Sequence, residues 1–168
     1  MMTDVLVISG SMGSGKTTVM AEASDLLAAA GIVHAAIDLD ALAVGHFPAL
    51  PFDLPERNLA SIWQNYGSAG IRRLLIAEAL DTTVKRDQIV RVIPEAAVVV
   101  CRLRARIETM ESRVREREPG ILQAELVWRV RELEASLDST RIEDFSVDND
   151  GRPVTAVARE VLRLAGWL

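Results

Sequence analysis

The chain has 168 residues, of which 49% are hydrophobic, and its formal net charge is −5. This length and composition are typical of one domain with a sizeable core, and the acidic balance argues against nucleic acid as a partner, since phosphate backbones are bound by basic surfaces. No run reaches the roughly 18 apolar residues of a membrane helix, and no basic segment precedes the N-terminal apolar stretch, so we expect a cytoplasmic protein without membrane contacts, as a monomer or homodimer.

Short β-rich segments alternate with longer helical ones along the chain, which predicts a parallel sheet covered by helices. One α/β domain, residues 1–168, accounts for the pattern. Cys101, the single cysteine, lies in an apolar run and is expected to be a core residue. The expected strands are 5–8, 33–39, 71–77, 97–103 and 145–147; the expected helices are 16–30, 58–67, 84–93, 106–118, 122–138 and a last one opened by Pro153; and 45–55 is expected to be a loop.

The segment between the first strand and the first helix carries the most specific motif, Gly10-Ser-Met-Gly-Ser-Gly-Lys-Thr17, which fits G-x-x-x-x-G-K-S/T. Its glycines allow backbone N–H groups to point inward, and the helix start adds a positive dipole end. Lys16 is expected to reach the β- and γ-phosphates of ATP, and Thr17 to hold Mg²⁺. The predicted nucleotide-binding residues here are Gly10, Ser11, Met12, Gly13, Ser14, Gly15, Lys16, Thr17 and Thr18.

Two carboxylates, Asp38 and Asp40, end the second predicted strand and point to the same face of it. The carboxyl ends of parallel strands border the ligand crevice. Asp40 is the preferred general base and a ligand of Mg²⁺ through water. The alternative is that Asp40 caps the following turn while Asp38 faces solvent. The third and fourth strands end at Ala77 and Arg102 without an acid, so the aspartate of motor-type ATPases is missing, which favours a kinase.

Arginines are concentrated in and just before the helix predicted at 106–118. At about 100° per residue, Arg106, Arg113 and Arg117 share a stripe beside the apolar face, whereas Arg115 lies opposite, with a glutamate four residues before it as a partner. We expect Arg113 and Arg117 to act in catalysis by stabilising charge on the transferring phosphoryl group. The alternative is an ordinary solvated helix. Arg129, in the next helix, either reaches a phosphate or buries its aliphatic part and extends its charged end to the solvent.

Together, the phosphate loop, the Asp-tipped strand, Arg113-x-x-x-Arg117 before Pro-Gly and the segment 147–153 resemble the P-loop small-molecule kinases, such as shikimate, gluconate, adenylylsulfate and chloramphenicol kinases. The resemblance implies a three-layer α/β P-loop NTPase fold with a five-stranded parallel sheet of order 2-3-1-4-5. It also implies a mobile lid at 106–120, an adenine pocket near Arg152, and ATP and Mg²⁺ as cofactors. The acceptor region differs from the better-known members, because it is aromatic and weakly charged: His46, Phe47, Phe52, Trp63 and Tyr66. These residues either bind the acceptor or belong to the core.

The expected function is therefore that of an ATP-dependent phosphotransferase acting on a hydroxyl of a small molecule, whose identity the sequence does not indicate. A second possibility is an ATP-binding switch or regulatory P-loop protein without phosphoryl transfer. A third is a kinase acting on a polynucleotide end, against which the acidic balance counts.

Overall fold

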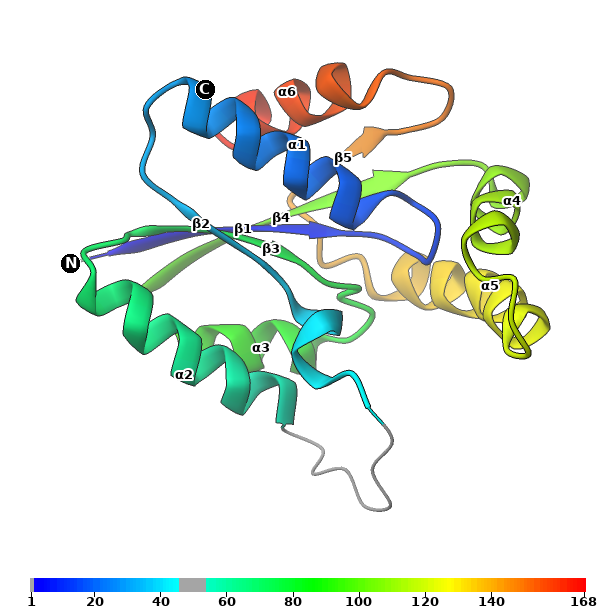
Figure 1. Ribbon diagram of the computed structural model, residues 1–168, viewed down its shortest axis with the longest axis horizontal. Helices are drawn as coiled ribbons and strands as arrows, with labels where there is room; N and C mark the ends of the chain where they lie inside the picture. The colour runs from blue at the N-terminus through cyan, green and yellow to red at the C-terminus, as the bar shows by residue number, and fades with distance from the viewer. Residues whose placement is uncertain (1, 46–53) are drawn as a thin grey trace.

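A computed structural model describes residues 2–45 and 54–168, which fold around one five-stranded parallel sheet (Figure 1). The strand order is β2-β3-β1-β4-β5, and every neighbouring pair is parallel, as predicted. The strands are β1 (Thr3–Ser9), β2 (Ala35–Asp38), β3 (Arg73–Ala77), β4 (Ala96–Arg104) and β5 (Phe145–Asp148).

Helices cover both faces of the sheet. In Figure 1, α1 and α6 lie on one face and α2 and α3 on the other, while α4 and α5 form an arm beside the carboxyl end of β4. A 3₁₀ turn, η1, follows β2 directly. The helical elements are α1 (Lys16–Ala29), η1 (Leu39–Ala43), α2 (Leu54–Ser68), α3 (Thr83–Val92), α4 (Ile107–Arg117), α5 (Gln123–Thr140) and α6 (Val154–Leu164).

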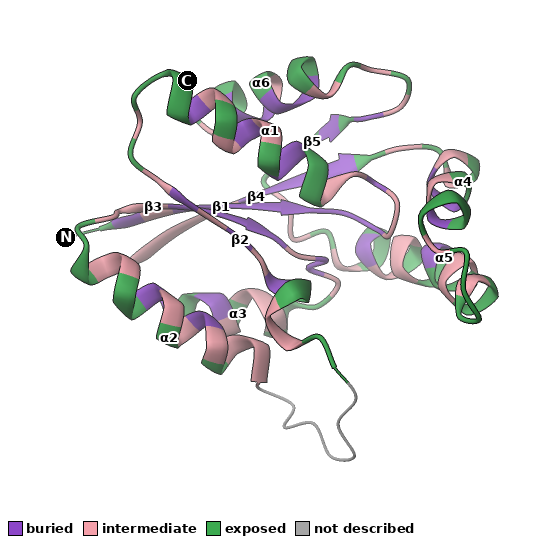
Figure 2. Cartoon of the chain, in the orientation of Figure 1, coloured by how far each residue is buried: buried purple, intermediate pink, exposed green. Residues whose placement is uncertain are grey.

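The central strand β1 is buried on both faces, because each face packs against its own helical layer (Figure 2). Leu6 and Ile8 belong to the core under α1 and α6, and Val5 and Val7 to the core under α2 and α3. The alternation follows from the two-residue period of a strand. Cys101 is fully buried in the first of these cores, as predicted, and burial raises the pKa of its thiol to about 12.

The boundaries of several elements differ from those expected, among them those of β2, α2 and α6. Strand β2 begins at Ala35 and ends at Asp38, since Leu39 already starts the 3₁₀ turn. Helix α2 begins at Leu54, with Pro55 in its first turn, where the missing N–H is harmless. Pro153 is the extended N-cap of α6 rather than its first residue. Most of the loop expected at 45–55 lies outside the described residues.

None of the helices within residues 2–45 and 54–168 has the length and apolar character needed to cross a membrane.

Candidate functional site

The phosphate loop joins β1 to α1, and at two of its positions the backbone has the left-handed conformation that favours glycine. Gly13 has φ +75° and Gly15 has φ +96°. A Cβ atom at Gly13 would collide with the carbonyl oxygen of Met110, and one at Gly15 would lie 2.5 Å from Nδ2 of Asn149. The loop is thus closely packed from outside, and larger residues at these positions would displace it.

Three distant elements hold the loop from outside. The hydroxyl of Ser11 donates to Val130 O in α5 at 2.9 Å, and Asn149 Nδ2 donates to Ser14 O at 2.6 Å. Arg113 Nη1 donates to Gly13 O at 3.1 Å. Because the C=O and the next N–H of a trans peptide point in opposite directions, the bond to Ser14 O turns the N–H of Gly15 away from Asn149. The loop is therefore preorganised by α4, α5 and the segment after β5.

The open end of α1 suits a nucleotide phosphate. The helix starts at Lys16 with no side-chain cap and no acidic residue in its first turn. Its first N–H groups have no acceptor within the helix and lie at the positive end of the dipole. Ser14 adds a buried hydroxyl oxygen without a hydrogen-bond partner among the described residues. An anion with several acceptor oxygens fits these donors.

Lys16 lies over the loop and lines a cleft next to it, together with Asp40 and Glu78. Its Nζ donates to Ser11 O at 3.1 Å. Burial lowers the pKa of Lys16; the nearby charges of Asp40, Glu78 and Asp38 counter this effect, and Arg117 adds to it. Lys16 therefore lies within the electrostatic influence of the acids at the strand ends.

Asp38 and Asp40 have different environments. Asp38 Oδ2 accepts a hydrogen bond from Thr17 Oγ1 at 2.6 Å, and Oδ1 accepts from the N–H of Asp40 at 3.1 Å. Asp38 therefore caps η1, the role that the alternative interpretation gave to Asp40. The exposed Asp40 side chain instead lines the cleft. The oxygens of Thr17 and Asp38 are ligands of the kind that Mg²⁺ takes.

No group of three or more His, Cys, Asp or Glu in the described ranges could hold a metal ion. Mg²⁺ in nucleotide sites keeps several waters and phosphate oxygens as ligands, so it needs few oxygens from the protein. Thr17 and Asp38 are the residues that would provide these oxygens for Mg²⁺.

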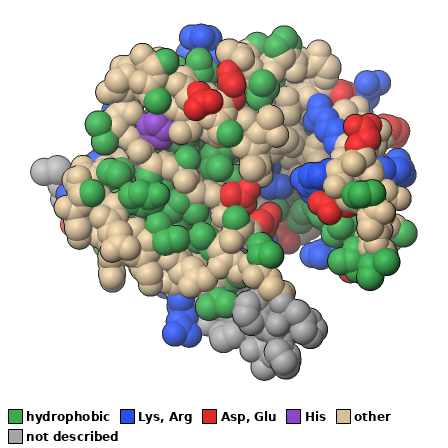
Figure 3. All heavy atoms as spheres, in the orientation of Figure 1, with side chains coloured by type: hydrophobic (Ala, Val, Ile, Leu, Met, Phe, Trp, Pro, Cys, Tyr) green, Lys and Arg blue, Asp and Glu red, His purple; other side chains and the backbone are tan. Residues whose placement is uncertain are grey.

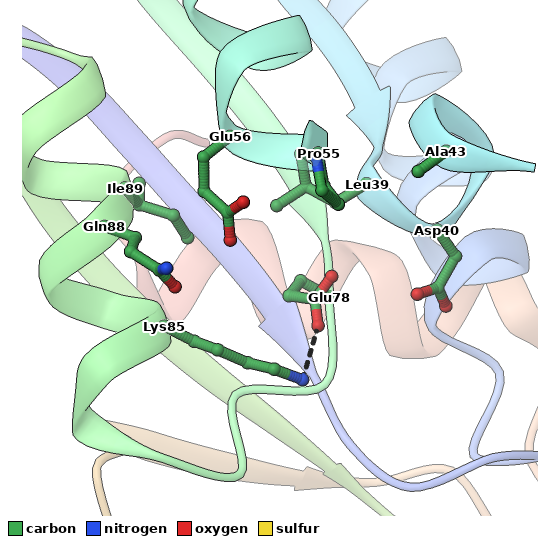
Figure 4. Close-up of a pocket in the computed structure, with 9 residues that line it drawn as sticks. All are labelled: Leu39, Asp40, Ala43, Pro55, Glu56, Glu78, Lys85, Gln88 and Ile89. Atoms are coloured by element: carbon green, nitrogen blue, oxygen red, sulfur yellow. Dashed lines mark hydrogen bonds and ion pairs between the residues drawn. The ribbon is translucent and has the colours of Figure 1, made fainter. Parts of the chain in front are cut away.

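Glu78 is the acid that the sequence argument missed at the end of the third strand. It follows Ala77, the last residue of β3, and lies in the cleft between Asp40 and Lys85 (Figure 4). Burial raises the pKa of Glu78, and Asp40 adds to the rise, while Lys85 and Lys16 oppose it. The expectation that the third strand ends without an acid is wrong, because Glu78 is the residue directly after its last position, Ala77. An acid immediately after an apolar strand is a pattern that the sequence itself contains.

Lys85, at the start of α3, is held by the same strand end. Its Nζ lies 3.1 Å from Glu78 Oε1, 2.9 Å from Asp81 Oδ1 and 2.9 Å from Ala79 O. Burial by itself lowers the pKa of Lys85, but the charge of Glu78 and the bonds to both acids outweigh it, so the pKa is raised overall. Lys85 was not singled out from the sequence, because no local motif marks it.

The two arginines expected to act in catalysis occupy different positions. Arg113 is half-buried and bridges Gly13 O and Asn149 O, at 3.1 Å each. Arg117 is 59% exposed, and its Nε donates to Glu118 at 2.9 Å. Arg115 forms the predicted i,i+4 pair with Glu111 at 3.1 Å. Helix α4 thus presents one arginine that is bonded to the phosphate loop and one that is exposed and paired with its neighbour in the chain.

Arg152 and Arg129 also differ in their surroundings. Arg152 donates to Asp148 O at 2.9 Å and to Glu160 Oε2 at 2.6 Å, and so braces the turn between β5 and α6. Arg129 lines a cavity of about 270 Å³ together with Met12, Lys16, Asp40 and other cleft residues. Its position fits the phosphate-reaching alternative. Figure 3 shows acidic side chains in the middle of this face and basic ones towards the α4–α5 arm.

A second cavity, of about 330 Å³, opens on the other side of Asp40, and we call it the η1–α3 cavity (Figure 4). Trp63 and Tyr66, two of the residues considered for acceptor binding, belong to the hydrophobic core instead. His46, Phe47 and Phe52 lie outside the described residues. The η1–α3 cavity is lined by Leu39, Asp40, Ala43, Pro55, Glu56, Glu78, Lys85, Gln88 and Ile89.

Solved structures with the same fold include several kinases. A gluconokinase from Sinorhizobium meliloti 1021 superposes with a TM-score of 0.60 at 21% identity, covering 97% of this chain and 91% of the other. A shikimate kinase from Acinetobacter baumannii, in complex with shikimate, gives 0.59 at 16% identity over 97% and 92%. The APS kinase of Mycobacterium tuberculosis, in complex with AMPPNP and APS, gives 0.62 at 18% identity over 98% of each chain.

No protein-family model and no curated protein sequence matches the chain. The structural likeness extends over nearly the whole chain, and it shows that the fold is that of the P-loop small-molecule kinases.

Proposed function

We propose that the protein transfers the γ-phosphoryl group of ATP to a hydroxyl of a small molecule. The observation that supports this most strongly is that two cavities meet at one pair of acids. Asp40 and Glu78 line both the cavity that contains Lys16 and the η1–α3 cavity. A nucleotide phosphate in the first and an acceptor in the second would therefore face each other across these carboxylates.

The phosphate loop, Lys16, Thr17 and Asp38 bind and orient the donor in this proposal. ATP with Mg²⁺ supplies the phosphoryl group and neutralises part of its charge when bound. The loop N–H groups bind phosphate oxygens, and the Lys16 ammonium leaves Ser11 O, 3.1 Å away, for them. Thr17 and Asp38 offer oxygen ligands to Mg²⁺, and Asp40 contributes through water.

Asp40 is the proposed general base. Its side chain is free to approach an acceptor, whereas Asp38 is bonded to Thr17 and Glu78 to Lys85. The acceptor hydroxyl gives its proton to Asp40, its oxygen forms a bond to the γ-phosphorus, and the bond to the bridging oxygen breaks, which releases ADP. Most of the rate enhancement in such a reaction comes from positioning and charge stabilisation.

Arg113 and Arg117 complete the proposed site. Arg117 is exposed, near Lys16, and can move to the transferring group, where its charge is most useful in the transition state. Arg113 acts mainly by holding the loop in place through Gly13 O. Arg152 supports the β5–α6 turn, which would form part of the pocket for the adenine of ATP.

The experiment that tests this function is ATP turnover against a broad acceptor panel, with an acceptor-free control. We expect ADP to form in step with a phosphorylated acceptor detected by mass spectrometry. ATP binding without transfer to any acceptor would contradict the proposal and favour the alternative of a nucleotide-dependent switch.

A further inference from the structure

The polar lining of the η1–α3 cavity is dominated by hydrogen-bond acceptors. Three carboxylates border it, those of Asp40, Glu56 and Glu78, together with the amide of Gln88. Among the described lining residues, the only cationic side chain is Lys85. The charge of the cavity wall therefore depends on whether Lys85 is available to a ligand.

The positive charge of Lys85 is already engaged by acids of the protein. Its Nζ donates to Glu78 Oε1 at 3.1 Å and to Ala79 O at 2.9 Å, and it forms an ion pair with Asp81 Oδ1 at 2.9 Å. Two of these partners are themselves carboxylates. The positive charge is therefore matched within the protein, and the cavity presents excess negative charge.

Glu56, in the first turn of α2, points into the cavity from the side opposite Asp40 (Figure 4). Its Oε2 atom is buried, with no hydrogen-bond partner in the described part of the chain. A buried carboxylate oxygen without a donor is unfavourable, so a ligand N–H at this point would be strongly bound.

Other cations near these acids do not line this cavity, and Lys16 borders the adjoining one. Arg57 and Arg91 border a separate hollow of about 220 Å³, and Glu56 and Gln88 line both spaces. The acceptors of Glu56 and Gln88 therefore separate the two arginines from Asp40. Within the η1–α3 cavity, a carboxylate of the acceptor would face three carboxylates, and the donors among the described lining side chains are only the Gln88 amide and the paired Lys85.

We propose that the acceptor is a small hydroxylated amine, such as an amino sugar or amino alcohol, whose ammonium group binds Glu56 while its hydroxyl faces Asp40. This assignment rests on the phosphotransferase function proposed above. The cavity volume of about 330 Å³ suits a small ligand, and the apolar walls of Leu39 and Ile89 can pack against its carbon skeleton. Carboxylated acceptors are rejected by like charge.

The first test compares acceptors that differ in one group. The probes are glucosamine, glucose and glucuronate, together with ethanolamine, ethylene glycol and glycolate, each at equal concentration with ATP and Mg²⁺. Phosphorylated product is measured by mass spectrometry, and binding by calorimetry in the presence of a non-hydrolysable ATP analogue. We expect the amine to be preferred over its acid counterpart in at least one set, both in binding and in turnover.

The second test replaces Glu56. Glu56→Gln should lower kcat/KM for the preferred amine by about 10- to 100-fold, mainly through KM, and change the neutral analogue less than about twofold. Asp25→Asn, an exposed charge change on α1, is the control and should leave the preference intact. Retained folding of both variants is checked by thermal unfolding.

The outcomes separate this inference from the function on which it rests. Preferred phosphorylation of glucuronate or glycolate would overturn the inference and support the phosphotransferase function. An amine preference that Glu56→Gln leaves unchanged would also overturn it. If no probe is phosphorylated, the function fails for these compounds, and calorimetry still decides the inference: Glu56-dependent amine binding supports it, and absence of amine binding refutes it.

Discussion

Arg113 and Arg117 lie one helical turn apart, yet their replacement by alanine should affect different properties of the protein. Arg113 connects α4 to the phosphate loop and to the turn after β5, through Gly13 O and Asn149 O. Arg117 contacts only its neighbour Glu118 among the partners found in the described chain. Arg113→Ala should therefore reduce stability, whereas Arg117→Ala should reduce catalysis.

The size of the stability effect follows from the bonds lost. A hydrogen bond to a charged group contributes roughly 1.5–3 kcal/mol, and the half-buried position of Arg113 allows water to replace part of it, so two bonds suggest a loss of about 2–3 kcal/mol. For a chain of this size this corresponds to a fall in Tm of about 4–12 °C. The exposed Arg117 pair contributes less than about 1 kcal/mol.

Urea unfolding without nucleotide measures the stability of each variant, and steady-state kinetics gives kcat and KM for ATP. Arg115→Ala is the matched control, because its partner Glu111 keeps a second ion pair with Arg131 at 2.7 Å. We expect Arg115→Ala to be nearly neutral in both assays. Equal destabilisation by Arg117→Ala and Arg113→Ala, or a loss of kcat in Arg115→Ala as large as in Arg117→Ala, would refute the reasoning.

Four further predictions concern the loop, the base, the arm and the thiol. Lys16→Ala should abolish tight ATP·Mg²⁺ binding in calorimetry while circular dichroism stays unchanged; unaltered affinity would contradict the phosphate-loop assignment. Asp40→Asn should lower acceptor phosphorylation by about 10²-fold or more with nucleotide binding largely kept, since a positioned base contributes about that much; a loss of stability with turnover intact would instead indicate a structural role. Hydrogen exchange across 106–120 should slow on adding a non-hydrolysable ATP analogue with Mg²⁺, most clearly after residue 114, because Met110 and Val114 are already fully buried; uniform exchange with and without nucleotide would argue against a lid. The Cys101 thiol, buried and with its pKa raised to about 12, should react with a thiol reagent at pH 8 only as fast as the protein unfolds; rapid labelling of the folded protein would show that the core is open there.

The order and type of the elements were predictable from the sequence, because they depend on local patterns. Apolar β-rich runs, helix periodicity and glycine or proline breaks are properties of neighbouring residues. The strand boundaries were less predictable. Leu39 continues the apolar pattern of β2, but Asp38 accepts a hydrogen bond from the N–H of Asp40 and so begins η1 at Leu39. Residue propensities do not predict an individual hydrogen bond of this kind.

The phosphate loop was the part of the site that the sequence determined by itself. Eight consecutive residues provide the glycines, the lysine and the hydroxyl, so no distant contact is needed to recognise the motif. The acids were only half predictable: Asp38 and Asp40 were expected at the end of the second strand, but Glu78 was not expected after the third, and the separate roles of the three were not predicted.

Only the tertiary structure decided those roles, because they depend on contacts between residues far apart in the chain. Asn149 bonds to Ser14 across 135 positions, and Ser11 to Val130 across 119. Glu56, Glu78 and Lys85 come together because α2 and α3 pack on the same face of the sheet and Glu78 directly follows β3. Helical periodicity placed Arg113 and Arg117 on one face, but the packing of α4 against the loop bonds the first to Gly13 and leaves the second exposed, since one turn of helix carries Arg117 beyond the contact.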